Sequence, residues 1–181
     1  GLGGDLASIE KRAQTFRTTW NGRLGEIEIP QFITMIGEYE DLVETFDRMA
    51  SYTNLLWSTD SENTEYGRLL QMVRETLSRA ASHVIFVPTQ LSHLNATRFG
   101  ELLAAPELAT RRHWLERVLE FKPYTLSEDV ERALSAKSIT ARSSWVRLHD
   151  EVANSQVFTF NGQELTLAAI SKMSYEKDRE T

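Results

Sequence analysis

Apolar residues recur every three or four positions along most of the chain, which is the spacing of an amphipathic α-helix. Asp5 stands where an N-cap would precede the first of these helices, and the stretch NGRLGEIEIP interrupts the pattern after it. The apolar stripe of this first predicted helix consists of Leu6, Ile9, Ala13, Phe16, Trp20 and Leu24.

A second, longer helix is predicted to begin around Pro30, because proline is tolerated in the first turn of a helix. A length of about 28 residues corresponds to about 40 Å at a rise of 1.5 Å per residue. Its apolar stripe consists of Phe32, Ile33, Ile36, Tyr39, Val43, Phe46, Ala50, Thr53 and Trp57.

Shorter helices are predicted in the rest of the chain. After the turn STDSEN, a helix beginning near Thr64 has Leu69, Leu70, Val73, Leu77, Ala80 and Val84 on its inner face, and Pro88 is expected to kink or end it. Asn95 caps a short helix that ends near Ala105, and Pro106 begins the next, which ends near Lys122. Ser127 opens a further helix, and the spacing of Trp145, Leu148 and Val152 defines one more.

The C-terminal part departs from the helical pattern. Two alternating runs joined by Asn161-Gly162 predict a β-hairpin at 155–168, because this dipeptide favours the positive φ angles of a two-residue turn. A short apolar-periodic stretch follows from Leu167 to Met173. Ser174 then resembles the N-cap of another helix, YEKDRET, which is too short to bury a face. We therefore expect this sequence to be a piece of a longer protein.

Because neither a repeat nor a low-complexity linker divides the chain, these elements predict a single lobe over residues 1–181. Its predicted class is all-α, an antiparallel helical bundle with a small β-hairpin near the C-terminus. The composition fits a globular protein, with 41% apolar and 25% charged residues.

Charge and cysteine content narrow the functional classes. The net charge of −6 argues against a general nucleic-acid or anionic-membrane binder, and no apolar run approaches the ~18 residues that span a bilayer. The chain has no cysteine, which excludes disulfides and thiolate metal sites and favours a cytoplasmic location.

The histidines do not have the spacing of a helical zinc site, which needs two of them four residues apart on one face. The four present are His83, His93, His113 and His149, and the closest pair is separated by Pro88. We interpret them as helix-flank or partly exposed residues. The spacing therefore argues against a zinc site formed by this chain alone.

Two charged clusters are interpreted as helix surfaces rather than as sites. The acidic cluster Glu38, Glu40, Asp41 and Glu44 has the spacing of a solvated face beside an apolar stripe, and the basic run Arg111–Arg117 lies near Glu107 and Glu120. The glycines form no phosphate-binding loop, and no serine lies in a Gly-x-Ser-x-Gly motif. We predict no catalytic, cofactor-binding or metal-ligating residue in the chain.

The chain resembles a known protein family in the order of its helix-packing and helix-capping residues rather than in any catalytic residues. The resemblance includes FRTTWNGRL (Phe16–Leu24), ASYTNLLWSTDSENTEYGRLLQ (Ala50–Gln71), the hairpin FTFNGQELTL and Asp178-Arg179. Its longest block, Ala105–Val152, contains APEL, HWLER, KPYTLSEDVE and WVRLHDEV. In these blocks the chain resembles the N-terminal region of bacterial oligoendopeptidase F, in the thimet-oligopeptidase-like family of zinc metallopeptidases, over nearly its whole length.

The resemblance implies that this chain is the N-terminal, non-catalytic part of a longer zinc metalloendopeptidase that hydrolyses internal bonds of short peptides. It implies a zinc held by a His-Glu-x-x-His helix and a later Glu, all in downstream polypeptide, with the motif Glu taking a proton from the metal-bound water. Because that motif is absent from this chain, we predict that the chain alone holds no zinc and is inactive. The implied partners are oligopeptide substrates and the downstream catalytic domain, and the implied role is to wall or gate the substrate channel.

A free-standing helical module that binds a protein or peptide in a groove is the alternative. Such a module should keep its apolar residues inside, whereas part of a larger lobe should leave an apolar face uncovered. Trp57, Trp114 and Phe121 are the candidates for that face.

Overall fold

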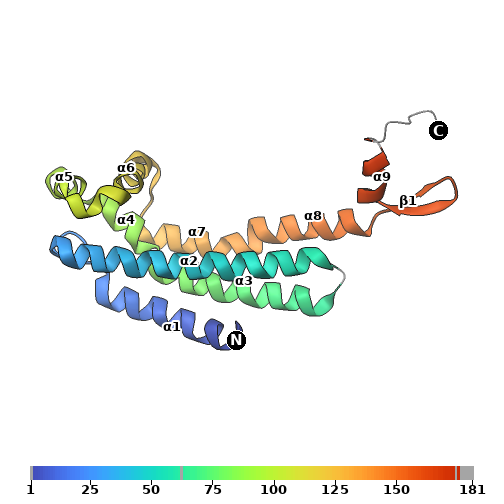
Figure 1. Ribbon diagram of the computed structural model, residues 1–181, viewed down its shortest axis with the longest axis horizontal. Helices are drawn as coiled ribbons and strands as arrows, with labels where there is room; N and C mark the ends of the chain where they lie inside the picture. Colours follow the sequence, from blue (N-terminus) through green and yellow to red (C-terminus); the bar gives the residue numbers. More distant parts are fainter. Residues whose placement is uncertain (1, 62, 174, 176–181) are drawn as a thin grey trace. The chain divides into compact units, whose positions relative to one another are not determined.

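A computed structural model describes residues 2–61, 63–173 and 175. Helices dominate, and one two-stranded hairpin lies near the C-terminal end (Figure 1). The predicted all-α class with a C-terminal hairpin is therefore confirmed. The contacts divide the chain into two compact units, unit 1 (Gly1–Lys137) and unit 2 (Ser138–Thr181).

Unit 1 begins with three long helices, α1 (Leu2–Trp20), α2 (Ile29–Thr59) and α3 (Thr64–Val84). α2 runs antiparallel to both α1 and α3 (Figure 1). α1 packs chiefly against α3, and α2 also packs mainly against α3. The three helices thus form an antiparallel bundle in which α3 is the common partner.

Local capping residues fix where α2 and α3 begin. Pro30 lies in the first turn of α2, as predicted, and Glu28 forms a capping box with Gln31. The Asn63 side chain accepts hydrogen bonds from the backbone N–H groups of Glu65 and Tyr66, at 3.0 and 3.3 Å. The expected N-cap at Asp5 is wrong, because the helix already begins at Leu2 and Asp5 lies within it. The two early glycines each cost α1 only about 1 kcal/mol relative to alanine, which does not prevent a helix.

The rest of unit 1 consists of short helical pieces. They are α4 (Phe86–His93), α5 (Ala96–Ala104), the 3₁₀ turn η1 (Pro106–Arg111), α6 (Arg112–Phe121), the 3₁₀ turn η2 (Lys122–Tyr124) and α7 (Glu128–Ser138). Of the kink or stop expected at Pro88, the structure has a stop: α3 ends at Val84, and Pro88 lies in the first turn of α4. Asn95 caps α5 as predicted, its side chain accepting from the backbone N–H of Arg98 at 2.8 Å.

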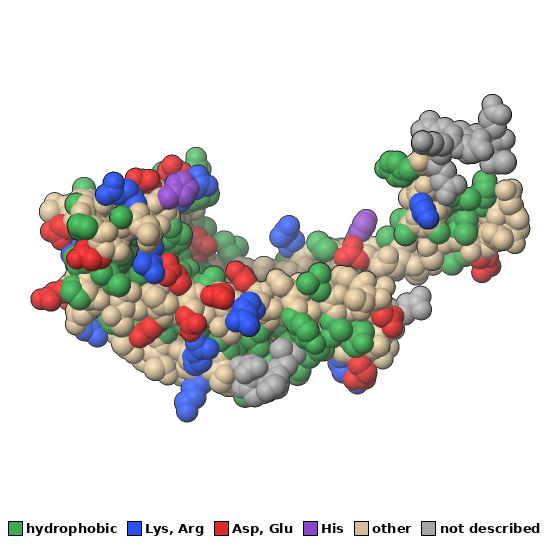
Figure 2. All heavy atoms as spheres, viewed as in Figure 1, with side chains coloured by type: hydrophobic (Ala, Val, Ile, Leu, Met, Phe, Trp, Pro, Cys, Tyr) green, Lys and Arg blue, Asp and Glu red, His purple; other side chains and the backbone are tan. Residues whose placement is uncertain are grey.

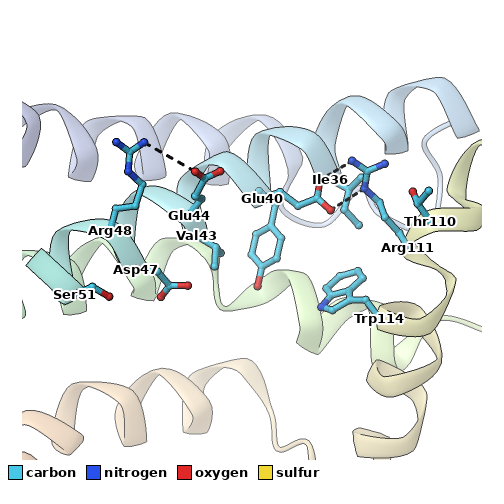
Figure 3. A pocket seen from close by; sticks show the side chains of 11 residues that line it. Ile36, Glu40, Val43, Glu44, Asp47, Arg48, Ser51, Thr110, Arg111 and Trp114 are labelled. Carbon is cyan, nitrogen blue, oxygen red and sulfur yellow. Dashed lines mark hydrogen bonds and ion pairs between the residues drawn. The ribbon is translucent and has the colours of Figure 1, made fainter.

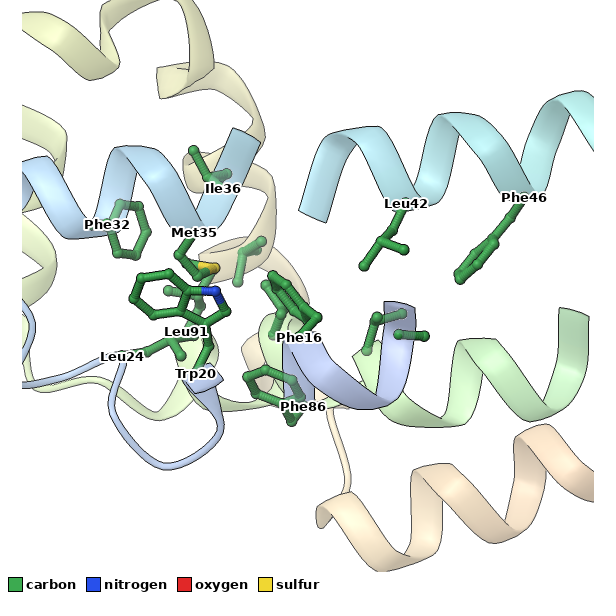
Figure 4. Packing of buried hydrophobic residues seen from close by; sticks show 14 of the residues in the cluster. Phe16, Trp20, Leu24, Phe32, Met35, Ile36, Leu42, Phe46, Phe86 and Leu91 are labelled. Carbon is green, nitrogen blue, oxygen red and sulfur yellow. The ribbon is translucent and has the colours of Figure 1, made fainter. Parts of the chain in front are cut away.

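One hydrophobic core fills unit 1, and Figure 4 shows how α1, α2 and α4 contribute to it. Every residue of the first predicted stripe is buried, although Leu24 lies beyond the end of α1 at Trp20. On α2 the buried face is partly displaced from the prediction: Met35, Leu42 and Met49 are buried, whereas Val43 and Trp57 are only half-buried. Because these three methionine and leucine positions are seven residues apart, they lie on one side of the helix, towards the other core helices.

Unit 2 consists of the π-helical segment η3 (Ile139–Ser143), α8 (Ser144–Ser155), the strands β1 (Val157–Phe160) and β2 (Gln163–Thr166), and α9 (Leu167–Met173). The strands pair antiparallel from Val157↔Thr166 to Phe160↔Gln163. The turn residues Asn161 and Gly162 have φ angles of 50° and 77°, as the sequence predicted for a tight hairpin.

The helix predicted around Trp145 is confirmed, but its apolar side chains are not covered. Trp145, Leu148 and Val152 are 71%, 48% and 50% exposed. None of the described side chains of α8, the hairpin or α9 is fully buried. The helix predicted after Ser174 lies outside the described residues. Nowhere in the described ranges is there a helix both long and apolar enough to cross a membrane.

Candidate functional site

A groove of about 690 Å³ lies in unit 1, between α2 on one side and η1 with the start of α6 on the other (Figure 3). We call it the α2–η1 groove. Its lining consists of Ile36, Tyr39, Glu40, Val43, Glu44, Asp47, Arg48, Ser51, Thr110, Arg111 and Trp114. The three-to-four-residue spacing along α2 places the members from that helix on one face, and Pro106 starts the turn that carries Thr110 and Arg111 to the opposite wall.

A bidentate ion pair joins the two walls of the α2–η1 groove. Arg111 donates from Nε and Nη2 to the two carboxylate oxygens of Glu40, at 2.8 and 2.6 Å. This hydrogen bonding with Glu40 raises the pKa of Arg111 above its already high ordinary value. A planar guanidinium–carboxylate pair of this kind fixes orientation as well as distance, so it sets the spacing between α2 and η1.

Aromatic rings form the inner end of the α2–η1 groove. The Tyr39 and Trp114 rings have centroids 6.1 Å apart and planes inclined by 42°. Tyr39 also contacts Phe16 of α1, with centroids 6.3 Å apart. Burial raises the pKa of the Tyr39 hydroxyl, so this group is neutral at physiological pH. The inner end therefore offers apolar contact area rather than a reactive nucleophile.

The outer end of the groove is polar. Glu44 and Arg48 are paired at 4.0 Å, the limit of an ion pair, and Asp47 and Ser51 lie close by (Figure 3). Such a lining can bind a ligand through hydrogen bonds and apolar contacts. It does not place a nucleophile beside a base, and the described part of the chain holds no group of three or more His, Asp or Glu residues suited to a metal ion.

The four residues of the predicted acidic cluster all lie on α2, but they point in two different directions. Glu40 and Glu44 face the α2–η1 groove, whereas Glu38 and Asp41 face α1. Glu38 accepts a hydrogen bond from the Trp20 indole N–H at 2.7 Å, and Asp41 forms an ion pair with Arg12. The four carboxylates therefore do not converge. Figure 2 shows acidic and basic side chains interspersed over the visible face of unit 1.

The four histidines lie on four different helices. His83 on α3 is half-buried, and burial followed by the charge of Arg17 holds its pKa below the ordinary value. The Nδ1 atom of His93 on α4 lies 2.7 Å from the Thr89 carbonyl oxygen. His113 on α6 is exposed, and His149 on α8 lies beside Asp150, at 3.4 Å.

The arginines of the basic run Arg111–Arg117 form hydrogen bonds and ion pairs within the protein. Besides the Glu40 pair of Arg111, Arg112 donates to the Leu103 carbonyl at 2.9 Å, and Arg117 donates to Glu120 at 2.7 Å. Sequence reasoning missed the Arg111–Glu40 pair because the two residues are 71 positions apart.

Uncovered apolar side chains lie mainly in the last third of the chain. Of the three aromatic residues proposed for an uncovered face, Phe121 is 53% exposed, whereas Trp57 and Trp114 are half-buried. The exposed large apolar residues from Phe121 onwards are Phe121, Tyr124, Leu126, Val130, Leu134, Trp145, Val146, Leu148, Val152, Val157, Leu167, Met173 and Tyr175.

Comparisons with known proteins agree with the resemblance seen in the sequence. Residues 90–158 match the family model described as Oligopeptidase F. The crystal structure of oligoendopeptidase-F from Enterococcus faecium has a similar fold over 98% of this chain, with a TM-score of 0.81 and 16% sequence identity. This chain spans 36% of the length of that chain. A search of the curated proteins finds no match. The predicted resemblance is confirmed, by the family model in part of the sequence and by the fold in nearly all of it.

Proposed function

We propose that this chain is the N-terminal, non-catalytic helical part of a zinc-dependent oligopeptidase, and that it walls or gates the channel by which short peptides reach the metal. The observation that carries the proposal is the similarity in fold over 98% of this chain to an oligoendopeptidase-F of which it spans 36%. The match of residues 90–158 to the oligopeptidase family supports it independently.

Among the residues that the structure describes, none form a site that fits zinc, so the proposal places the metal in the downstream catalytic part of the protein. The described histidines lie on α3, α4, α6 and α8, and a helical zinc site needs two on one helix face. When bound, zinc would supply an acidified water and a Lewis acid for peptide hydrolysis. The contribution proposed for this chain is mechanical: it excludes folded proteins and bulk water from the channel.

A wall or gate must keep its shape, and the structure of unit 1 is suited to this. α2 has 31 residues, a rod of about 46 Å at 1.5 Å per residue, and it packs along α3. The Glu40–Arg111 pair braces α2 against η1. Each unit has uncovered apolar side chains, such as Phe121 in unit 1 and Trp145 in unit 2, against which the catalytic part of the same protein, the proposed partner, could pack. The cysteine-free composition supports a cytoplasmic location.

The first experiment measures zinc content and peptidase activity of this chain alone and of its full-length parent protein. We expect about one zinc per chain and cleavage of a quenched bradykinin-like peptide only with the parent protein. Stoichiometric zinc together with turnover in the isolated chain would contradict the proposal.

The second experiment tests the wall in the full-length protein with a series of quenched peptides of increasing length. Arg111→Gln breaks the brace between α2 and η1 and should allow longer peptides to be cleaved relatively faster. Arg117→Gln is the matched control, because its partner Glu120 lies on the same helix. An identical length profile for the two variants would show that unit 1 does not limit access.

The alternative, a free-standing peptide-binding module, is favoured by the α2–η1 groove, which combines the Tyr39 and Trp114 rings with a polar outer end. Titration of the isolated chain with a mixture of short peptides, followed by tryptophan fluorescence, distinguishes the peptidase part from the free-standing module. Saturable micromolar binding that is lost in Trp114→Ala would favour the module.

A further inference from the structure

α7 is poorly anchored by apolar packing, although it belongs almost entirely to unit 1. It has no buried residue. Its apolar side chains Val130 and Leu134 are 44% and 54% exposed, and Leu126 just before it is 47% exposed. Because apolar burial is the main favourable contribution to helix packing, α7 gains little of its position from burial.

A three-residue ionic cluster fixes the first turn of α7 to α1. Arg17 of α1 donates from Nη2 to Glu128 Oε1 at 2.6 Å, and Arg132, one turn further along α7, donates to the same oxygen. The Arg17 and Glu128 side chains are only 23% and 22% exposed, so water screens this pair less than an ordinary surface pair. Glu128 is also the first residue of α7, where the helix dipole favours a negative charge.

The core holds the α1 side of this cluster in place. The Arg17 guanidinium lies over the ring of Phe86, 5.8 Å from its centroid, and Phe86 is fully buried. The Phe16 ring packs against the same Phe86 ring at 5.7 Å. Arg17 is therefore presented on a rigid surface, while Glu128 is presented by a helix with few other anchors.

The charges around Glu128 keep it ionised. Burial by itself raises the pKa of Glu128, but the hydrogen bonds and charges of Arg17 and Arg132 outweigh burial and hold that pKa below its usual range. The neighbouring charged groups are His83 on α3, which interacts with Arg17, Arg132 and Glu10 of α1, and Asp129, 3.7 Å from Arg132.

We propose that Arg17, Glu128 and Arg132 form an ionic latch that holds α7 on α1, and that its opening releases α7 from unit 1 without unfolding the core. Unit 2 begins at Ser138, the last residue of this helix, so the latch controls the segment through which the chain passes from one unit to the other. This inference does not depend on the proposed peptidase function, because it concerns contacts within the chain.

Amide hydrogen exchange on the full chain tests the latch. Glu128→Gln keeps the shape of the side chain and removes its charge. Because hydrogen bonds to charged groups are the stronger ones, we expect roughly tenfold faster exchange of the α7 amides and unchanged exchange in α3. Asp129→Asn is the matched control: it removes a charge from the same first turn, but the Asp129 side chain is 93% exposed and its ion pair, with Arg132, lies within α7. We expect it to change α7 exchange by about twofold or less.

A charge reversal adds a second, independent measurement. Arg17→Glu should open α7 as Glu128→Gln does. Combining it with Glu128→Arg should slow the exchange again but only in part, because the pair is re-formed with opposite polarity while Arg132 and the helix dipole oppose a positive charge at residue 128. Equal exchange of α7 in Glu128→Gln and Asp129→Asn would overturn the proposal. So would an equal acceleration in α3, because that result would mean that the cluster stabilises the whole of unit 1 and not the position of α7.

Discussion

Replacing Phe86 by alanine should destabilise unit 1 more than any surface change. Phe86 is fully buried at the start of α4, between the Phe16 ring and the Arg17 guanidinium. A phenylalanine side chain buries about 150–250 Å², and at about 25 cal/mol per Å² this corresponds to about 4–6 kcal/mol as an upper estimate. Large-to-small substitutions of buried phenylalanine cost about 3–5 kcal/mol, which is the loss we expect in the free energy of unfolding.

Phe121→Ala is the matched control, because it deletes the same atoms at a site that is 53% exposed. The Phe121 ring contacts the Arg117 guanidinium, 5.1 Å from the centroid, and an exposed contact of this kind is worth about 0.5–1 kcal/mol. We therefore expect the control to lose about 1 kcal/mol.

Urea unfolding followed by far-ultraviolet circular dichroism and by tryptophan fluorescence measures both variants. With a urea dependence of about 2 kcal/mol per M, Phe86→Ala should lower the midpoint by about 2 M and Phe121→Ala by about 0.5 M. Two probes are needed because the chain has two units, and their coincidence tests for a single transition. Equal midpoint shifts in the two variants would refute the assignment of Phe86 to the core.

Three further changes have defined outcomes. Asn63→Ala removes the N-cap of α3 and should lower the free energy of unfolding by about 1 kcal/mol in the same urea assay. Gly162→Ala forces a Cβ onto a residue with φ of 77° and should weaken the hairpin, seen as loss of the cross-strand NOEs between Val157 and Thr166, while Gly100→Ala within α5 should leave them unchanged. The pKa of His83 is lower in the folded chain than in the unfolded chain, so as the pH falls the unfolded chain takes up this proton before the folded chain does. The stability that neutral His83 contributes is therefore present above about pH 6.5 and is lost as the pH falls through the pKa of the folded chain. His83→Gln should remove that part of the pH dependence in urea midpoints measured between pH 5 and 8, and a slope identical to the parent chain would exclude His83 as its source.

The parts of the fold set by near neighbours in sequence could be predicted well. The α1 stripe, the Asn95 cap, the stop before Pro88 and the Asn161-Gly162 turn each depend on residues within one or two turns of each other. Helical periodicity and capping chemistry act over that range, so the sequence alone carries the information.

Features that depend on distant partners could not be predicted. Arg111 meets Glu40 and Arg17 meets Glu128 across 71 and 111 positions, and periodicity contains no information about such pairs. The same limit explains why Trp145 was assigned to an apolar helix face but its exposure was not foreseen. Periodicity identifies the face of a helix and does not identify what, if anything, covers it.

The order in which the helices pack also has a consequence for biosynthesis. α1 packs chiefly on α3, but the two helices are far apart in the sequence. Between them, 43 residues separate Trp20 from Thr64, and α3 is complete at Val84, 64 positions after Trp20. At about 5–20 residues per second, the ribosome needs roughly 3–13 s to complete α3 after α1 has been made. During that interval the apolar face of α1 lacks its main partner, although α2 can already contact it. A nascent chain stalled before Val84 should therefore be a preferred client of holdase chaperones, and one stalled well beyond it should not.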